Sequence, residues 1–375
     1  MTKAAELAKM GEVLTNSQIG GRRNILINGA MQVAQRGTSL TGLGSGGGSA
    51  EYMLDRFDII NTSAGRLTAT QTADGPSGFA NCLKLDVTTA DTSISASEVM
   101  ILEQRIEGQN VQQLQYGSSS AQSVTFSFYV KGNAAATYTM EFRNEEDGRN
   151  NGQEFSVTTD WTRVVLTFAG DTAGSAVDDD NTHAFTWSII LHGGTTFSGG
   201  TFSSNTWHST NNLRIGENQT SFLDSTDRTF FITGVQMEVG SQATPFEHRS
   251  FGEELQLCQR YFTKESAASG ANYKSYAMGQ AATTTVARCS VFLPTPMRST
   301  PSVVLSGNVN TFAGNSAGAS DACTAIALNS DGDAGTHHVS VSLNVTVASG
   351  YVVGDAVELL SNDNTSTSFA LDAEL

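Results

Sequence analysis

The chain carries many short stretches in which apolar and polar residues alternate. A period of two gives a β-strand one apolar face, so each stretch predicts a half-buried strand. From about Tyr52 to Phe246 helical periodicity is nearly absent, and the regular spacing is typical of an antiparallel β-sandwich. The clearest stretches are SVTFSFYVKG (123–132), TYTMEFRN (137–144), WTRVVLTFAG (161–170), AFTWSIILHG (184–193) and RTFFITGVQMEVG (228–240), the last with Phe231, Thr233, Val235, Met237 and Val239 on one face.

Two segments show helical periodicity instead. Residues 2–16 predict a short amphipathic helix that starts at Thr2 and ends before Gly20. A second helix is expected over 250–266, because Ser250 and Glu253 form a capping box. Its apolar stripe should be buried and consists of Phe251, Leu255, Cys258 and Phe262.

The rest of the chain completes a division into four parts. Residues 1–48 are expected to form the N-terminal helix and an attachment segment, with a strand-like stretch from Ile25 to Val33 and a Gly/Ser-rich loop after it. The β-sandwich, a jelly roll, covers 49–249, and the linking helix covers 250–266. Alternation returns in 267–375 and predicts a smaller C-terminal β domain, most clearly at Val339, Val341, Leu343, Val345 and Val347.

Composition excludes several classes of protein. The 375 residues include 21 Lys and Arg against 37 Asp and Glu, and the formal net charge of −16 disfavours nucleic-acid binding and attraction to anionic membranes. No apolar run approaches the roughly 18 residues of a membrane span. We interpret four widely spaced cysteines as buried free thiols: Cys82, Cys258, Cys289 and Cys323.

Catalytic and metal-binding motifs are missing. The sequence contains no G-x-S-x-G, no H-E-x-x-H and no Walker loop, so no enzymatic activity and no cofactor are expected. Clustered acidic residues at 145–147, 178–180 and 331–333 leave a structural Ca²⁺ ion open, but they lack EF-hand spacing and are interpreted as solvated turns. The neighbouring His337 and His338 point to opposite faces in a strand and do not chelate one ion.

One polar stretch has the composition of a sugar-binding loop. Sugars are bound by an aromatic ring that stacks on C–H groups and by amide or charged side chains that bond hydroxyls. Residues 199–212 supply both, in Trp207, His208, Asn205 and Asn211. The competing interpretation is that Trp207 is packed under a long loop. Trp161 and Trp187 are expected in the core, and a weaker surface pair is expected in the last domain, at Tyr273 and Tyr276.

Four blocks resemble a family of bacteriophage virion proteins of the tail-fibre type. They are NILINGAMQVAQRGTS (24–39), YMLDRF (52–57), the stretch GVQMEVGSQATPFEHRSFGEELQLCQRYF (234–262), and the terminal DAEL (372–375). In the second block Asp55 and Arg56 are interpreted as a buried ion pair or a hydrogen-bond anchor. The segment TTDWTRVVLTF (158–168) also looks like carbohydrate-binding modules of the jelly-roll type, in which a Trp at the position of Trp161 tends to be structural.

The resemblance implies a non-enzymatic virion appendage that attaches the particle to host surface polysaccharide. It also implies a homotrimer, assembly in the bacterial cytoplasm, no insertion into membrane, and attachment to other virion proteins through the N-terminal segment. The alternative is a head-fibre, decoration or tail-adaptor protein that binds no receptor. A polysaccharide depolymerase is disfavoured because no solenoid repeat is found.

Overall fold

The computed structural model describes residues 3, 23–44, 47–267, 272–329 and 339–375. They form two compact units, one of Met1–Phe251 with Leu375 and one of Gly252–Glu374. The predicted N-terminal helix lies outside the described residues except for Lys3, and so do the acidic turn 331–333 and the pair His337 and His338.

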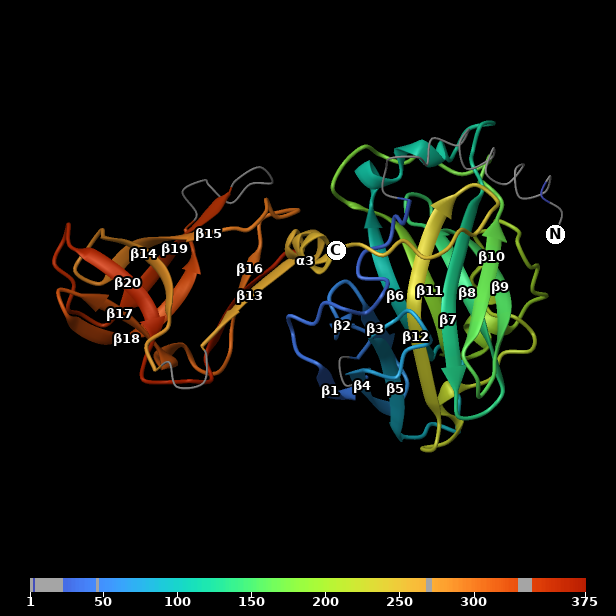
Figure 1. The fold of residues 1–375 in the computed structure, drawn as a ribbon, viewed down its shortest axis with the longest axis horizontal. Coiled ribbons are helices and arrows are strands. Elements are labelled where there is room, and N and C mark those ends of the chain that lie inside the picture. Colours follow the sequence, from blue (N-terminus) through green and yellow to red (C-terminus); the bar gives the residue numbers. More distant parts are fainter. Residues whose placement is uncertain (1–2, 4–22, 45–46, 268–271, 330–338) are drawn as a thin grey trace. The chain divides into compact units, whose positions relative to one another are not determined.

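The larger unit is a sandwich of two six-stranded antiparallel sheets (Figure 1). We call them the β12 sheet and the β11 sheet after a central strand of each. The order in the β12 sheet is β1 (Ser39–Leu43), β4 (Arg66–Thr72), β5 (Cys82–Thr89), β12 (Thr229–Val239), β7 (Val124–Gly132) and β10 (Thr162–Phe168). The order in the β11 sheet is β2 (Glu51–Tyr52), β3 (Asp58–Asn61), β6 (Val99–Glu107), β11 (His183–Gly193), β8 (Ala136–Asn144) and β9 (Arg149–Val157). The predicted jelly-roll β-sandwich is thereby confirmed.

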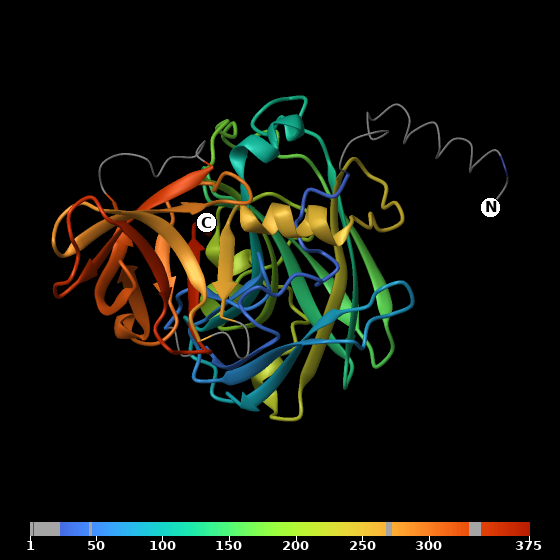
Figure 2. The same ribbon diagram turned by 60° about the vertical axis from the view of Figure 1, so that its left-hand side comes forward.

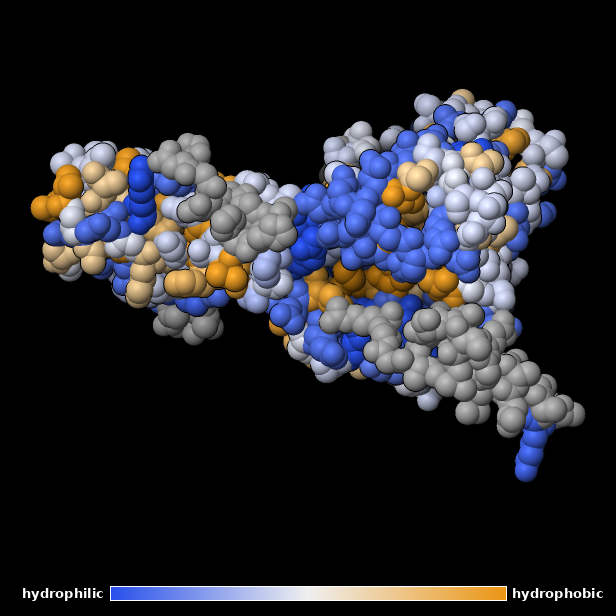
Figure 3. Space-filling view, turned by 90° about the horizontal axis from the view of Figure 1, so that it is seen from above, coloured by the Kyte–Doolittle hydropathy of each residue, from blue (hydrophilic) through white to orange (hydrophobic). Residues whose placement is uncertain are grey.

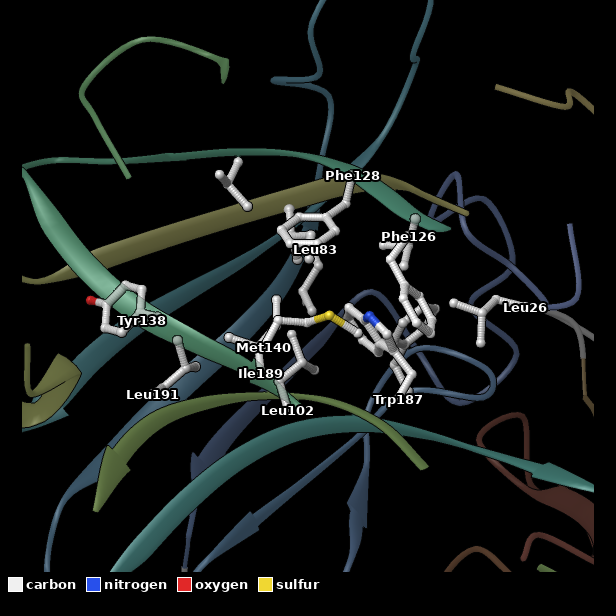
Figure 4. Packing of buried hydrophobic residues seen from close by; sticks show 14 of the residues in the cluster. Leu26, Leu83, Leu102, Phe126, Phe128, Tyr138, Met140, Trp187, Ile189 and Leu191 are labelled. Atoms are coloured by element: carbon white, nitrogen blue, oxygen red, sulfur yellow. The ribbon is translucent and has the colours of Figure 1, made fainter. Parts of the chain in front are cut away.

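The core lies between the two sheets and is rich in aromatic side chains. Trp187 is fully buried there, as expected, with its ring edge-on to Phe57 and Phe128 at centroid distances of 6.0 and 6.3 Å. Figure 4 shows Met140 beside this indole, between residues from both sheets. Edge-to-face pairs of this kind add about 0.5–1.5 kcal/mol each beyond the burial of their area.

Strand β12 departs from the predicted alternation at Gly234. Before it the buried apolar residues are Phe230 and Ile232, and after it they are Val235 and Met237. Gly234 has φ +65°, and the pairing with β7 shifts register between Thr233 and Gln236. This bulge changes which side chains face the core, so Phe231 points away from it, in contrast to the prediction.

The strand-like stretch predicted from Ile25 to Val33, in the block NILINGAMQVAQRGTS (24–39), is instead an irregular and largely buried segment. Asn24 donates to the Val235 carbonyl and accepts from the Met237 amide, so it ties the segment to β12. Asn28, at φ +59°, accepts from the amide of Val33 and donates to the Asp55 carbonyl. A side-chain amide thus replaces ladder hydrogen bonds that an extended strand would make.

The block YMLDRF (52–57) supplies two hydrogen-bond anchors, Asp55 and Arg56. The Asp55 carboxylate is fully buried and accepts from the backbone and the side-chain amides of Gln35, at 2.7 and 2.5 Å. Arg56 is also buried, at φ +72°, and donates to the Arg105 carbonyl at 2.6 Å. The interpretation as hydrogen-bond anchors is therefore correct for both side chains.

Short helices lie in the connections of the larger unit. They are η1 (Gly108–Asn110), η2 (Gln112–Leu114), α2 (Thr195–Ser198), η3 (Asn211–Leu213) and η4 (Phe222–Asp224). Helix α2 and helix η3 belong to the long connection from β11 to β12, which contains the predicted sugar-binding residues.

The smaller unit is β, as predicted. Helix α3 (Phe251–Gln259) leads into it, and is shorter than the expected 250–266 because residues 262–266 form a strand; Phe251 of the expected buried stripe is 57% exposed. Figure 2 shows the closed barrel of β14 (Ser275–Ala281), β15 (Val286–Phe292), β19 (Ser340–Val347), β18 (Ala319–Leu328), β17 (Phe312–Ser316) and β20 (Ala356–Ser361). A three-stranded sheet has the order β13 (Phe262–Ser266), β21 (Ser368–Asp372) and β16 (Ser302–Leu305), and η5 (Val309–Thr311) precedes β17.

All four cysteines are buried thiols, as predicted. No helix in the described part of the chain is both long and apolar enough to cross a membrane. Figure 3 shows a mainly hydrophilic or neutral face on the larger unit, with a band of hydrophobic residues across it, and scattered hydrophobic residues on the smaller unit.

Candidate functional site

Trp207 lies half-buried against the core of the sandwich. Its ring is edge-on to Tyr116 and Phe142, with centroids 5.6 and 5.9 Å away, and its Nε1 donates to the Ala169 carbonyl at 2.6 Å. The indole therefore anchors the connection from β11 to β12. These contacts agree with the competing interpretation, in which Trp207 is packed under a long loop.

The other predicted residues sit around this anchor in different environments. Asn205 has a backbone φ of +55°, and its side-chain oxygen accepts a hydrogen bond from the amide of Ala169. The carbonyl of the same Ala169 accepts from Trp207. His208 pairs through its backbone with Asn150 of β9, with N–O distances of 2.9 and 2.7 Å. Asn211 is exposed at the start of η3. Asn205, Trp207 and His208 thus lie together beside β9, whereas Asn211 lies apart from them with an exposed side chain.

The outer face of the β11 sheet carries carboxylates that are each paired with arginine. Arg105 lies 2.8 Å from Glu103, Arg143 lies 2.9 Å from Glu145, and Arg214 from the connection to β12 reaches across to Glu141 of β8. The pair of Arg214 and Glu141 fastens the connection to the sheet. Because the carboxylates are occupied by guanidinium groups, the arrangement is that of a structural network.

His183 belongs to this network and makes the stability of the larger unit depend on pH. The pKa of His183 is lowered to about 4, mainly by burial; Glu145 opposes this shift, and Arg105, Arg143 and Arg56 contribute to it. An unfolded histidine titrates near pH ~6.5, so between about pH 6.5 and 4 the unfolded state binds more protons and the folded state loses stability as the pH falls. We expect a loss of roughly 1–2 kcal/mol between pH 7 and pH 5 from this group. Urea unfolding at both pH values should show that the His183→Gln variant lacks this loss; an equal loss in the variant would contradict the assignment.

Aromatic rings gather on the outer face of the β12 sheet. Trp161 directly precedes β10 and lies beside Lys131 of β7 and Phe231 of β12, with the Lys131 ammonium 5.3 Å from the Trp161 ring and 4.7 Å from the Phe231 ring. Lys84 of β5 approaches Phe231 from the other side, at 5.6 Å. These lysines are paired with carboxylates, Lys131 with Asp74 at 2.7 Å and Lys84 with Asp86 at 2.8 Å.

A second aromatic group continues this surface. Phe79 contacts Tyr129, Phe246 and His248, at centroid distances of 5.3, 5.0 and 5.2 Å. Gly234 lets the rings lie close to the strand, because a Cβ there would be 2.8 Å from Phe79 and 3.0 Å from Tyr129. We call the surface the aromatic face and define it by Phe79, Tyr129, Trp161, Phe231, Phe246 and His248, of which five are half-buried and His248 is exposed.

The aromatic face was not found by sequence reasoning. Trp161 was expected in the core, and the structure shows it half-buried on the outside, with Phe231 at 6.3 Å. Tyr276 was expected on the surface and is buried, donating to the Thr367 carbonyl, whereas Tyr273 is exposed. The adjacent pair Phe230 and Phe231 was the available signal, since neighbours in a strand face opposite sides.

Acidic residues in the described loops serve as turn anchors. Asp180 accepts from the amide and the hydroxyl of Thr182, which lowers the pKa of this carboxyl. Asp147 accepts from the amides of Arg149 and Ser175. Within the described residues, one group of ligand-type side chains is compact enough for a metal ion and lies elsewhere, at the end of β11: Asp91, Glu98 and His192.

Comparisons with known proteins return likenesses of structure alone. No family model and no curated protein sequence matches the chain. A solved structure described as "CBM4 structure and function" matches at TM-score 0.31 and 13% identity, over 56% of this chain and 97% of that one. The CBM22-1 xylan-binding domain from Paenibacillus barcinonensis Xyn10C matches at TM-score 0.28 and 10% identity, over 60% and 100%.

A domain of viral origin is also among the similar structures. The enzymatically active domain of tailspike protein 4 from bacteriophage CBA120 matches at TM-score 0.29 and 11% identity, over 58% of this chain and 21% of that one. At such TM-scores and identities these likenesses say nothing about what this chain binds. The assignment of the fold rests on the strand pairing.

Proposed function

We propose that this chain is a non-enzymatic, glycan-binding protein of a bacteriophage virion appendage, a tail fibre, and that the aromatic face holds the glycan. The observation that carries the proposal is the row of Trp161, just before β10, with Lys131, Phe231 and Lys84 on the neighbouring strands β7, β12 and β5. Sugar rings stack on aromatic faces through their C–H groups, and charged side chains at the rim bond their hydroxyls.

The row suits a chain of sugar units better than one small molecule. It runs from Trp161, just before β10, across β7 and β12 to β5, and each of these three strands supplies one ring or ammonium group. Asp74 and Asp86 add acceptors for hydroxyl groups beside the lysines. A linear polysaccharide laid across the strands would meet these groups in turn.

The attachment role follows from multivalency. Sugar contacts are weak singly, and several chains on one particle strengthen them without new contacts. The net charge of −16 disfavours adhesion by simple electrostatic attraction to anionic cell envelopes. We therefore infer that the chain binds polysaccharide by contacting its neutral hydroxyl and C–H groups.

Alanine substitutions on the aromatic face test the proposal. Trp161→Ala and Phe231→Ala should each weaken binding to immobilised host surface polysaccharide by about tenfold or more, because truncation of a central aromatic anchor costs ~2 kcal/mol. Tyr273→Ala is the matched control, since it removes an exposed ring from the smaller unit. Affinity is measured by biolayer interferometry, with thermal melting of each variant as the check on folding.

Variants in the predicted loop separate the two surfaces. If Asn211→Ala or His208→Ala abolishes binding while the aromatic variants keep it, the glycan site lies on the loop of Asn205, Trp207, His208 and Asn211. Failure of the full-length protein to bind host cells or to compete with the virion for adsorption would remove the receptor role, and would favour a decoration or adaptor protein of the particle.

A further inference from the structure

Three side chains of metal-ligand type converge where β11 ends. Asp91 follows β5, Glu98 directly precedes β6, and His192 is the next-to-last residue of β11. One ligand atom from each lies within 4.8 Å of the others. The group lies on separate chain segments, so the packing of the sandwich creates it.

His192 is poised for an additional partner. Its side chain is fully buried, its Nδ1 lies 2.7 Å from the Ser221 hydroxyl, and its Nε2 has no hydrogen-bond partner among the residues that the structure describes. Nε2 faces Glu98, with Oε2 3.9 Å away, too far for a hydrogen bond. A buried polar atom without a partner costs roughly 1–3 kcal/mol, so an occupant that bonds it is favoured.

The two carboxylates are held in place by backbone amides. Asp91 accepts from Ala64 at 2.9 Å and from Ser93 at 3.2 Å, and Glu98 accepts from Ser95 at 2.7 Å. Each carboxylate has about four lone-pair positions, so these bonds leave capacity for a cation. The site is thus preorganised.

We propose that Asp91, Glu98 and His192 bind one divalent transition-metal ion of the Zn²⁺ type. An imidazole nitrogen with two carboxylate oxygens is a ligand set that Zn²⁺ accepts, whereas Ca²⁺ requires six to eight oxygen ligands. Three protein ligands leave a fourth position for water. The contact from Nδ1 to Ser221 would fix the orientation of the ring, as partners behind a metal-bound histidine generally do.

Such an ion would clamp the start of the connection that carries Trp207. The Gly194 amide donates to the Glu98 carbonyl at 2.8 Å, and the Thr196 amide donates to the Ala96 carbonyl at 2.9 Å. The metal would add a stronger link between the same two segments, since it joins residues 91 and 98 to the end of β11. The expected effect of the ion is therefore to stabilise this connection.

Metal titration of the full-length, tag-free protein tests the site. After treatment with a chelator and removal of the chelator, ZnCl₂ at a hundredfold excess over its dissociation constant should raise the melting temperature of the larger unit by about 5–10 °C. Calorimetry should show one tight site. CaCl₂ at the same concentration is expected to have little effect.

Two substitutions make the test specific. Glu98→Gln keeps the size of the side chain and removes the carboxylate ligand, and His192→Asn removes the imidazole nitrogen. Both variants should lose the tight Zn²⁺ site and the thermal shift. Asp227→Asn, at an exposed carboxylate outside the group, should keep both. The proposal is overturned if wild-type protein shows no saturable Zn²⁺ binding, if Ca²⁺ alone stabilises it, or if Glu98→Gln binds Zn²⁺ as the wild type does.

Discussion

Replacing Arg214 by methionine is expected to lower the free energy of unfolding of the larger unit by about 3–5 kcal/mol. The Arg214 guanidinium donates to both oxygens of Glu141, at 2.7 and 2.6 Å, and the two side chains are only 10% and 1% exposed. Methionine fills much of the same volume but leaves the Glu141 carboxylate buried without its partner. An uncompensated buried charge is among the most destabilising changes in a protein.

Tryptophan fluorescence in urea measures the effect, because all three tryptophans lie in the larger unit. Arg228→Met is the matched control: Arg228 pairs in the same two-pronged way with Asp224, at 2.7 Å for both bonds, but Asp224 is 40% exposed. We expect its loss to cost less than about 1 kcal/mol. The double variant Arg214→Met with Glu141→Leu should recover most of the stability, and equal costs for Arg214→Met and Arg228→Met would contradict the argument.

Trp207→Ala is expected to cost about 2–3 kcal/mol of stability, somewhat less than the ~3–5 kcal/mol typical of a fully buried Trp. The substitution removes the edge contacts to Tyr116 and Phe142 and the hydrogen bond to the Ala169 carbonyl. A loss of glycan binding in this variant would thus report a loosened connection as much as a lost contact.

Trp207→Phe separates the two effects. It keeps an aromatic ring against Tyr116 and Phe142 but lacks the Nε1 donor, so about half of the stability should return. Thermal melting and limited proteolysis within 199–212 give the readouts. If Trp207→Ala melts like the wild type and resists proteolysis equally, Trp207 does not anchor the connection and its ring is free for a ligand.

The alternating pattern predicted most of the fold because strands with one buried face repeat with a period of two. It placed β7, β8 and β19 well, since their pairings with β10, β9 and β15 run without a register shift. It assigned the wrong face at the start of β12, where Gly234 adopts a positive φ and the register shifts. A glycine in a strand does not reveal by itself whether it marks such a bulge.

The candidate site was harder to predict because it depends on which strands are neighbours. Trp207 looked free of any core, yet Tyr116 and Phe142, distant in sequence, supply one. Trp161 and Phe231 meet only because β10 and β12 both pair with β7. Alternation identifies the outer face of a strand but not the strand that lies beside it.

The order of strands also governs how the larger unit reaches its folded state. Strand β12 comes last in the sandwich but lies between β5 and β7, and β11 likewise lies between β6 and β8. Until residues 183–239 have emerged from the ribosome, the strands already made have no central partner. Their edges stay open to pairing with other chains, and closure must await contacts far apart in sequence, which makes folding slow. Early in its synthesis this polypeptide is therefore at its most prone to aggregation, a hazard that chaperones in the producing cell must limit.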